Sequence, residues 1–393
     1  MSRSLCMIFE GIGPYNAIGK IAMAEVRAAL GAGFHVSVVA DRLDESLRDH
    51  VQWLKLYRPP RGFALQWLTA RRFIRAALGN RQFDVVHAHQ PQAASLADVF
   101  QCHFLTRVAY ETKTLESRPG LRARAVRAQQ QIVLYAEDHF YRRWNPRTRM
   151  LYNSQVTQRD FHRLYGPLPR EEVFLYPCPP LDLPSPAERR AARAKLIGHE
   201  YSGPMVGYLG GIQERKGYRQ LISALEGDND IFLLLAGQYT EGFEMPRLRG
   251  RSKAFGLLSD TRTFYAACDA FVVPSIYESF GLVAFEAAVR GAPVILSPAV
   301  GAAPHLTAYG AGMTWQHDQP LVPLVRQAVR DRERMNNGAR QMAQENGEEQ
   351  HAQRLLRIYE KVMREGRGSR TGTGAVDFGG ATSPFRGVSS SQP

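Results

Sequence analysis

The chain has 393 residues, a length that suits two domains of ordinary size better than one hydrophobic core. Lys and Arg number 50 against 37 Asp and Glu, and the four cysteines show neither zinc-site spacing nor a C-x-x-C pair. A disulfide-rich framework is therefore excluded, and a reduced, cytoplasmic setting is expected. No run of about 18 apolar residues could span a bilayer, and the first residues do not read as a signal peptide. We expect no integral membrane protein.

The first elements predict a β–loop–α–β unit. Strands are expected over Leu5 to Phe9 and over 35–40, with a helix around 21–30. The loop before the helix is rich in glycine and includes Gly19. Its spacing differs from G-x-G-x-x-G, and Asp41 is a weak counterpart of a ribose-binding acid. A plain dinucleotide site is therefore a minor alternative.

Two later strands end near histidines. The segment Phe83 to Gln90, FDVVHAHQ, contains His87 and His89, and the segment Val99 to Arg107, VFQCHFLTR, contains His103. A histidine at a strand end usually bonds to backbone, so we expect His87 and His89 to be structural.

Residues 117–170 are rich in arginine. Eleven arginines face only three acidic residues there: Arg118, Arg122, Arg124, Arg127, Arg142, Arg143, Arg147, Arg149, Arg159, Arg163 and Arg170. Aromatic and aliphatic residues lie between them, a pattern that suits anionic lipid head groups. A solvated helix face is the plain alternative. Nucleic acid ranks third because no nucleic-acid-binding fold signature accompanies the charge, so none is expected as a partner.

A proline-rich hinge is expected over Tyr176 to Pro186, YPCPPLDLPSP, because repeated prolines do not form a core element. It divides an N-terminal domain, 1–180, from a C-terminal domain, 181–345. A helix pair over 322–363 is expected to end the folded part. Residues 366–393 are rich in Gly, Ser and Thr, a composition typical of a disordered tail.

The second domain opens on Pro204 to Leu225, where a buried strand, a glycine turn and the pair Arg215–Lys216 precede a helix. An ammonium group at the carboxyl edge of a parallel sheet is well placed for a phosphate in the crevice there. The alternative without a function is that Arg215 and Lys216 are a solvated pair of charges in a loop. We reject this alternative for Lys216 and leave it open for Arg215.

The most informative stretch is Phe271 to Ile295, which predicts a strand, a bend, a glycine, a helix from Leu282 to Arg290 and a second strand. A free helix N-terminus there suits a phosphate. Glu278 precedes the helix and Glu286 lies in it. Carboxylates beside a bound diphosphate accept hydrogen bonds from hydroxyl groups, so the combination indicates a nucleotide-sugar.

This stretch resembles the E-x7-E motif of family-4 retaining glycosyltransferases, which have the two-domain GT-B fold. The resemblance implies that Glu278 contacts the donor sugar and that Glu286 holds the ribose hydroxyls. It implies that the turn of Phe280, Gly281 and Leu282 holds the diphosphate.

The K-G pair of the same family matches Lys216 and Gly217, which implies that Lys216 contacts the diphosphate. The arginine of the family's earlier turn is absent, and Gly211 stands there. Either Arg215 supplies the second cation or the site uses one.

The resemblance also covers the N-terminal half. Gly19 matches a glycine of the first loop that approaches the donor phosphate and the acceptor. His103 matches a histidine near the reacting centre, with a role as hydrogen-bond donor to the sugar. The last helix, 346–365, is expected to cross back to the N-terminal domain.

We therefore expect an α/β protein with two facing Rossmann-like parallel-sheet domains and a cleft between them. The expected activity is metal-independent, cofactor-free, retaining hexosyl transfer, as in the assembly of cell-envelope polysaccharide. A nucleoside-diphosphate sugar would donate to a glycan, a lipid-linked or another hydroxyl acceptor. The setting would be cytoplasmic, with peripheral attachment to the inner membrane face through 117–170. The alternatives are a nucleotide-sugar epimerase or hydrolase of the same fold and a non-catalytic nucleotide-sugar or membrane-binding module, which acceptor-dependent turnover separates from the main interpretation.

Overall fold

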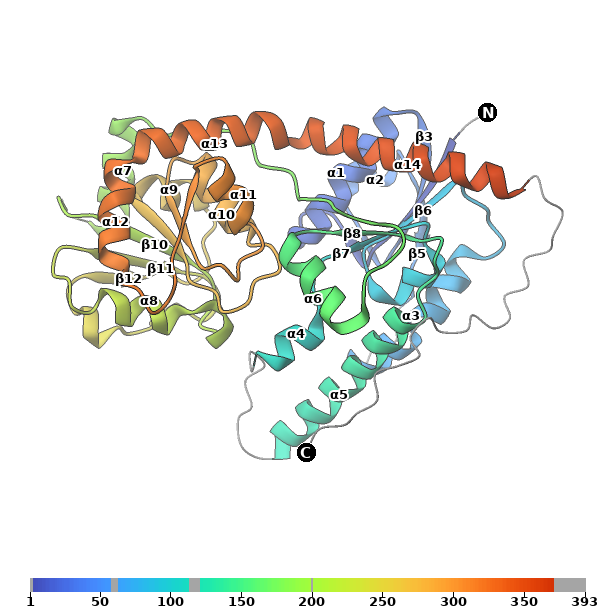
Figure 1. Cartoon of the computed structure of the whole chain (residues 1–393), viewed down its shortest axis with the longest axis horizontal. Helices are drawn as coiled ribbons and strands as arrows, with labels where there is room; N and C mark the ends of the chain where they lie inside the picture. Colours follow the sequence, from blue (N-terminus) through green and yellow to red (C-terminus); the bar gives the residue numbers. More distant parts are fainter. Residues whose placement is uncertain (1–2, 58–62, 113–120, 199–200, 371–393) are drawn as a thin grey trace.

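Two parallel β-sheets, one in each half of the chain, form the framework of the molecule (Figure 1). The structure is a computed structural model that describes residues 3–57, 63–112, 121–198 and 201–370. Within these ranges the first sheet has the strand order β5-β3-β1-β6-β7-β8-β9, and the second has the order β12-β11-β10-β13-β14-β15. The predicted α/β architecture with two parallel-sheet domains is confirmed.

The strands of the first sheet are β1 Arg3–Ile8, β3 Phe34–Ala40, β5 Gln52–Lys55, β6 Val85–Ala88, β7 Val99–Cys102, β8 Arg149–Tyr152 and β9 Glu171–Val173. Those of the second are β10 Met205–Leu209, β11 Phe232–Ala236, β12 Ser252–Ala254, β13 Ala270–Val273, β14 Val294–Leu296 and β15 Gly312–Thr314. A small ribbon pairs β2 Gly11–Ile12 with β4 Arg42–Leu43. All five residues of β11 are buried, as its continuous apolar run predicts for a strand covered on both faces.

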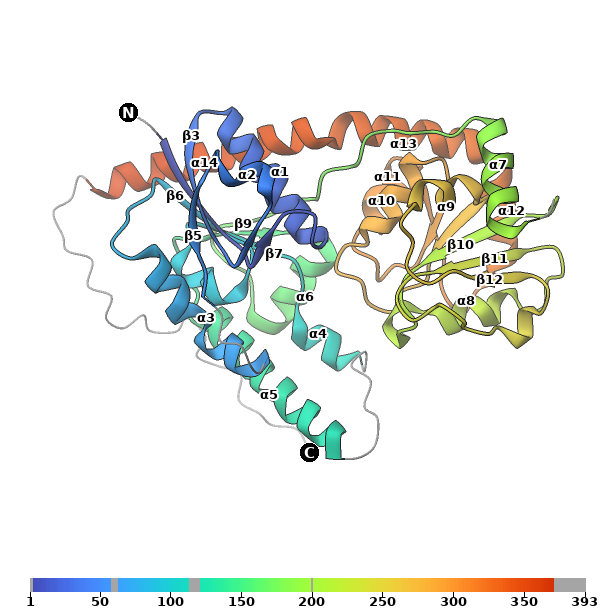
Figure 2. The same ribbon diagram turned by 180° about the vertical axis from the view of Figure 1, so that it is seen from behind.

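Helices cover both faces of each sheet (Figures 1 and 2). Their bounds are α1 Ala17–Gly31, α2 Glu45–Arg48, α3 Phe63–Leu78, α4 Thr106–Glu111, α5 Leu121–Arg142, α6 Gln155–Tyr165, α7 Pro186–Ile197, α8 Tyr218–Leu225, α9 Thr261–Ala267, α10 Leu282–Val289, α11 Ala303–Ala308, α12 Leu321–Arg330, α13 Arg332–Asn346 and α14 Glu348–Arg370. Tyr359 of α14 is buried in the same apolar cluster as β1, β3 and α1, so this helix completes the N-terminal core.

The chain passes between the halves twice. The first crossing, between β9 and α7, has no helix or strand. Helix α7 begins after the N-cap Ser185, which forms a capping box with Glu188, and Pro186 is its first residue. The expectation that this hinge adds nothing to the core is wrong for Tyr176 and Cys178, because both side chains are buried.

The second crossing runs through α13 and α14, which lie end to end along one side of the molecule (Figures 1 and 2). The expected helix pair over 322–363 is wrong in number, since α12, α13 and α14 divide this stretch. The last helix continues to Arg370, past the expected end at 365. Residues 371–393, most of the expected tail, lie outside the described residues. Among the described helices, none is long and apolar enough to cross a membrane.

Candidate active site

The predicted phosphate-binding turn of Phe280, Gly281 and Leu282, which we call the donor turn, leads from β13 into α10. Gly281 has a φ of +96°, and a Cβ there would lie 2.7 Å from Cγ1 of Val300, so the turn requires glycine. Within the described residues, the backbone N–H groups of Phe280, Gly281 and Leu282 have no acceptor in the protein. The first turn of α10 therefore presents free donors at the positive end of the helix dipole.

Two cations on the short 3-10 helix η2 Glu214–Lys216 contact Glu278, which precedes this turn. Gly217 follows with a φ of +70°, and its Cβ would lie 1.8 Å from the carbonyl oxygen of Pro274, so only glycine lets η2 approach the end of β13 so closely. Lys216 Nζ donates a hydrogen bond to Glu278 Oε2, and Arg215 Nη1 lies 3.5 Å from the same oxygen. The structure thus brings Arg215, Lys216 and Glu278 together.

The environment of these three groups differs from that of a solvated surface pair. The side chains of Arg215, Lys216 and Glu278 are only 23, 21 and 16% exposed. Two cations on one carboxylate are an arrangement that a diphosphate can replace, because its oxygens accept from the same donors. In the earlier turn, a Cβ on Gly211 would lie 3.2 Å from the carbonyl oxygen of Gln238, which leaves little room for the side chain that the family has there.

Glu286 lies on α10, where the hydroxyl of Tyr265 from α9 donates a hydrogen bond of 3.0 Å to its Oε2. Burial first, and then the charge of Glu286, raise the pKa of Tyr265 well above its ordinary value, so this hydroxyl remains a donor. The bond fixes one carboxylate oxygen of Glu286. Sequence reasoning missed Tyr265, because nothing in its local pattern separates it from an ordinary core aromatic.

Gly19 lies in the first turn of α1 and is buried. Its N–H donates to Asn16 Oδ1 at 2.7 Å, and a Cβ would lie 2.5 Å from the carbonyl oxygen of Gly11 and 2.7 Å from that of Gly13. Close packing of loop on helix therefore explains this glycine without a ligand. The predicted approach of Gly19 to the donor phosphate stays a prediction.

The histidines of β6 and β7 form a buried cluster with residues from distant elements. His89 Nδ1 lies 2.9 Å from His103 Nε2, and His103 Nδ1 lies 2.5 Å from the hydroxyl of Tyr176. On the other side, His89 Nε2 lies 3.0 Å from Glu25 Oε2, and Glu25 Oε1 lies 3.2 Å from His351 Nε2. The expectation of backbone partners for His89 is wrong, since its ring contacts side chains.

The same correction holds for His87, whose Nδ1 lies 2.8 Å from the hydroxyl of Tyr359. Burial lowers the pKa of His87 to about 3, so this ring is neutral near pH 7. Glu25, His87 and His89 are the only three potential metal ligands that the described ranges bring within 4.8 Å of one another. Because Nδ1 of His87 and both ring nitrogens of His89 already contact side chains, the cluster fits a hydrogen-bond network. The expected absence of a metal remains a prediction.

The contacts of this network fix its protons. Asn153 Nδ2 donates to the backbone carbonyl of His103 at 2.9 Å and to the Tyr176 hydroxyl at 3.2 Å, so the Tyr176 proton goes to His103 Nδ1. Burial lowers the pKa of His103 well below its ordinary value, so the neutral ring carries its own proton on Nε2 and donates it to His89. His89 then carries its proton on Nε2, which lies 3.1 Å from Met7 Sδ and 3.0 Å from Glu25 Oε2.

His351 completes the chain of contacts. Its Nδ1 lies 3.1 Å from the carbonyl oxygen of Leu175, and its Nε2 lies 3.2 Å from Oε1 of Glu25. Burial would raise the pKa of Glu25, but His89 and the hydrogen bond from His351 outweigh it and hold the pKa well below the ordinary range. Glu25 and His351 therefore form a buried polar contact between α1 and α14.

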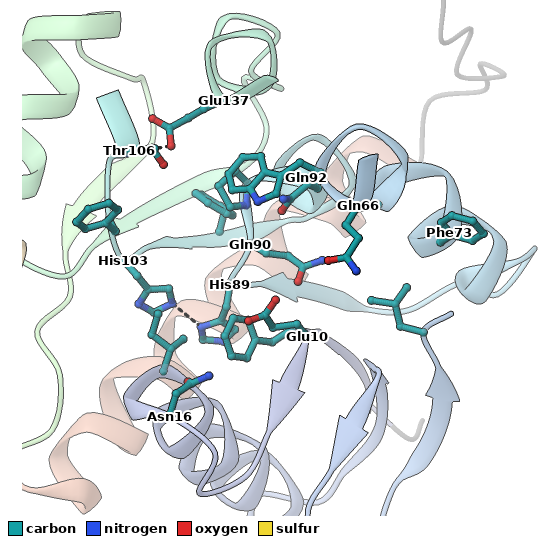
Figure 3. A pocket seen from close by; sticks show the side chains of 18 of the residues that line it. Glu10, Asn16, Gln66, Phe73, His89, Gln90, Gln92, His103, Thr106 and Glu137 are labelled. Carbon is teal, nitrogen blue, oxygen red and sulfur yellow. Dashed lines mark hydrogen bonds between the residues drawn. The ribbon is translucent and has the colours of Figure 1, made fainter. Parts of the chain in front are cut away.

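A cavity of about 300 Å³ opens beside this network in the N-terminal half (Figure 3). Its wall includes His89 and His103, joined by the hydrogen bond drawn in Figure 3, together with Gln90 and Gln92. Both glutamines are more than nine-tenths buried, and their amides have no protein partner within the described residues. Aromatic rings and buried amides together suit a polyhydroxylated ligand, because the amides offer both donors and acceptors.

The cavity wall and the donor turn meet at the boundary between the halves. The rings of Phe104 and Tyr277 lie 5.7 Å apart, and the rings of Tyr176 and Phe280 lie 4.6 Å apart. Ser154, the N-cap of α6, donates from Oγ to the carbonyl oxygen of Ser279 at 2.6 Å. A ligand bound in the cavity and a ligand bound at the N-terminus of α10 would therefore lie on opposite sides of these contacts.

Comparisons with known proteins agree with this architecture. A family model described as "Glycosyltransferase Family 4" matches residues 19–179, and one described as "Glycosyl transferases group 1" matches residues 194–349. The chain is 27% identical over 317 residues to a D-inositol 3-phosphate glycosyltransferase of Geodermatophilus obscurus, which covers 72% of this chain and 67% of the relative. It is 35% identical over 115 residues to a lipopolysaccharide core biosynthesis glycosyltransferase of Rhizobium meliloti, covering 28% of this chain and 34% of the relative.

Solved structures share the fold at low sequence identity. A sucrose-phosphate synthase from Thermosynechococcus elongatus matches with a TM-score of 0.71 at 18% identity, covering 92% of this chain and all of that chain. WaaG, a glycosyltransferase of lipopolysaccharide biosynthesis, matches with a TM-score of 0.65 at 17% identity, covering 92% and 99%. Because the two family models match consecutive segments in both halves, the chain belongs to the family-4 glycosyltransferases with the GT-B fold.

Proposed function

We propose that the protein transfers a sugar from a nucleoside-diphosphate sugar to a hydroxyl acceptor, with retention of configuration and without a metal ion or cofactor. The observation that carries this proposal is that Arg215 and Lys216 contact Glu278, two residues before the turn whose N–H groups find no acceptor among the described residues. The barrier of such a reaction lies largely in the negative charge that develops on the departing diphosphate. Preorganised donors aimed at that charge stabilise the transition state.

Each predicted residue receives a role. The N–H groups of Phe280, Gly281 and Leu282 and the cations Lys216 and Arg215 bind the diphosphate. Its oxygens then replace Glu278 on the cations, which frees this carboxylate to accept hydroxyl groups of the transferred sugar. Glu286, oriented by Tyr265, accepts from the ribose hydroxyls.

The acceptor occupies the cavity beside His103. In this structure both ring nitrogens of His103 contact protein side chains, so a hydrogen bond to the sugar requires that one of those contacts is exchanged. Gly19 holds the loop that leads to the cavity. One structural neighbour, HepE of Anabaena, was solved in complex with UDP-glucose, so uridine diphosphate is the first nucleotide to test.

Thermal unfolding with the diphosphates of uridine, guanosine and adenosine tests the donor site. A ligand at 100 times its Kd stabilises the folded state by about 2.7 kcal/mol. We expect one nucleotide to raise the melting temperature and the corresponding sugar nucleotide to support transfer. Sugar release that does not depend on an acceptor would favour the hydrolase alternative, and stabilisation by none of the three would contradict the proposal.

The two acids provide a matched pair of variants. We expect Glu286→Ala to weaken binding of the bare diphosphate, because the ribose contact is lost. Glu278→Ala should leave that binding nearly intact and reduce turnover. Calorimetry in which both folded variants bind like the parent would remove the ribose role from Glu286.

A second proposal concerns the membrane. Some arginines of residues 117–170 form ion pairs within the protein. Arg149 and Arg170 pair with Glu365, and Arg163 pairs with Glu111. Arg118 lies outside the described residues, as do the side chains of Arg122, Arg124 and Arg127. Exposed arginines and exposed apolar side chains occur together on α3, on α5 and at Arg143 directly after α5. Together we call them the α3/α5 face: Leu65, Leu68, Arg72, Arg75, Ile132, Tyr135, Arg142 and Arg143.

Exposed apolar side chains flanked by arginine are typical of a surface that binds anionic lipid. Tyr135, 70% exposed, is the most exposed large apolar side chain on the α3/α5 face. We therefore propose peripheral attachment at the cytoplasmic side of a membrane. The acceptor would be a glycan or a lipid-linked molecule of the cell envelope, and one relative, named for lipopolysaccharide core biosynthesis, supports this proposal.

A further inference from the structure

Tyr176 contacts both halves of the molecule at the site. Its side chain is 3% exposed although it belongs to the hinge between β9 and α7. Its hydroxyl contacts His103 and Asn153, and its ring lies 5.6 Å from that of His103 and 4.6 Å from that of Phe280. One side chain therefore touches both the cavity wall and the donor turn.

The hinge around Tyr176 is also tied to the second crossing. The carbonyl oxygen of Leu175 accepts from His351, and the backbone N–H of Cys178 donates to the carbonyl oxygen of Asn346 at 2.7 Å. These bonds join both crossings at the start of α14. The backbone on either side of Tyr176 is thus held in place by hydrogen bonds to the second crossing.

We propose that Tyr176 is a positioning residue for glycosyl transfer. Its hydroxyl sets the proton and ring orientation of His103 on the acceptor side, and its ring sets Phe280 at the diphosphate-binding end of α10. This role rests on the proposed function.

The two contacts of Tyr176 separate by mutation. Tyr176→Phe removes the hydrogen bond and keeps the ring, so we expect kcat to fall about five- to tenfold, the size of one lost hydrogen bond, while nucleoside-diphosphate affinity stays unchanged. Phe280→Leu removes the ring contact and keeps the hydroxyl, so it should weaken diphosphate binding about threefold or more with the pH profile unchanged. This second variant keeps the test valid if Tyr176→Phe folds poorly.

The pH profile distinguishes positioning from mere packing. The groups that face His103 are Tyr176, His89, Glu25 and His87. A hydrogen bond donated to the neutral imidazole disfavours its protonation, so its loss in Tyr176→Phe raises the pKa of His103. The acid-side decline of kcat should therefore move to higher pH, and the nitrogen resonances of His103 should change.

Tyr359→Phe is the matched control. Tyr359 is equally buried and its hydroxyl also bonds a buried histidine, His87, at 2.8 Å, but His87 does not line the cavity. We expect this variant to change the resonances of His87 and to leave kcat and its pH profile as in the parent.

Two failures are distinguishable. If the parent binds no nucleoside diphosphate, the proposed function fails. If the parent transfers sugar and Tyr176→Phe matches it in kcat, in pH profile and in the His103 resonances, the role of Tyr176 is overturned while the proposed function stands. Equal losses in Tyr176→Phe and Tyr359→Phe would also overturn it, because they would indicate a packing effect alone.

Discussion

The donor turn of the C-terminal half and the histidine network of the N-terminal half differ in how their charges are satisfied. At the donor turn, Glu278 and two cations share a partly exposed contact, and the part of the chain that the structure describes offers no acceptor to the adjoining N–H groups. In the network, Glu25 and His351 are buried and the histidine rings between Glu25 and Tyr176 form one continuous chain of contacts. The first arrangement can exchange partners with a ligand, whereas the second holds elements together.

The difference also lies in the chain distance that each site spans. The donor turn and its cations come from one domain, and the matching motifs follow each other along the chain. The network draws on α1, β6, β7, the hinge and α14, so that Glu25 and His351 stand 326 residues apart. The candidate ligand site is therefore built from turns that are close in the sequence. The histidine network, in contrast, joins elements that are far apart in the sequence.

The largest expected effect tests the structural side of this comparison. Glu25→Ala removes the buried carboxylate that contacts His89 and His351 and leaves these buried polar groups without their partner, so we expect a loss of about 3–5 kcal/mol in the free energy of unfolding. Urea unfolding measures it. The control is Asp182→Ala, which breaks the exposed pair with Arg262 and should cost no more than about 1 kcal/mol. Equal losses in the two variants would contradict a stabilising role for the buried contacts of Glu25.

The next effect tests the ligand-binding side. Lys216→Ala removes a preorganised cation from the leaving group, so we expect turnover to fall about 10²–10³-fold, or ~2.7–4 kcal/mol, with little change in stability. A comparable loss in Arg215→Ala would show that Arg215 replaces the arginine absent at Gly211. Lys195→Ala, in an exposed pair on α7, serves as the control and should retain parental turnover. A folded Lys216→Ala with most of its transfer intact would mean that the diphosphate binds elsewhere.

A smaller effect appears in the pH dependence of stability. The folded-state pKa of His87 is lowered to about 3, below the unfolded value of about 6.5, so the unfolded chain binds more protons between these values. The contribution of His87 to the free energy of unfolding is fully present above pH 6.5. It is lost as the pH falls below this value, by about 1.4 kcal/mol per pH unit. His87→Gln should show a correspondingly flatter decline than the parent between pH 6.5 and 5.

The control for this measurement is His50→Gln, since His50 is exposed on the N-terminal half. We expect its stability to follow the parental curve. A parental slope in His87→Gln would show that His87 is not held neutral in the folded state.

The smallest effect concerns the α3/α5 face. Each arginine near an anionic surface contributes about 1 kcal/mol, so Arg142→Glu with Arg143→Glu should weaken flotation with anionic vesicles several-fold or more. Binding of the parent should decrease from 0.1 to 1 M salt, as the Debye length shrinks from about 10 to ~3 Å. Arg190→Glu on α7, in the other half, is the control. Equal binding to neutral and anionic vesicles, or no binding to either, would contradict attachment through this face.

The amino-acid sequence by itself determined the fold class and the donor turn. Continuous apolar runs such as β11 are buried on both sides of a parallel sheet in almost any context. Gly217 and Gly281 have backbone angles and close contacts that only glycine accepts, and these requirements are local. The position of Lys216 beside Glu278 follows from such turns, so the motif could be recognised before the structure.

Only the tertiary structure decided the partners of Glu25, His89, His103 and His351, the burial of Tyr176 and the division of the last helices. A buried polar group needs a hydrogen-bond partner, but its own sequence neighbourhood does not say which distant element supplies it. His89 was expected to bond to backbone for this reason, and Tyr176 was read as part of a proline-rich hinge. Both assignments depended on α1, α14 and the donor turn meeting in space, an outcome of packing between elements that no local pattern encodes.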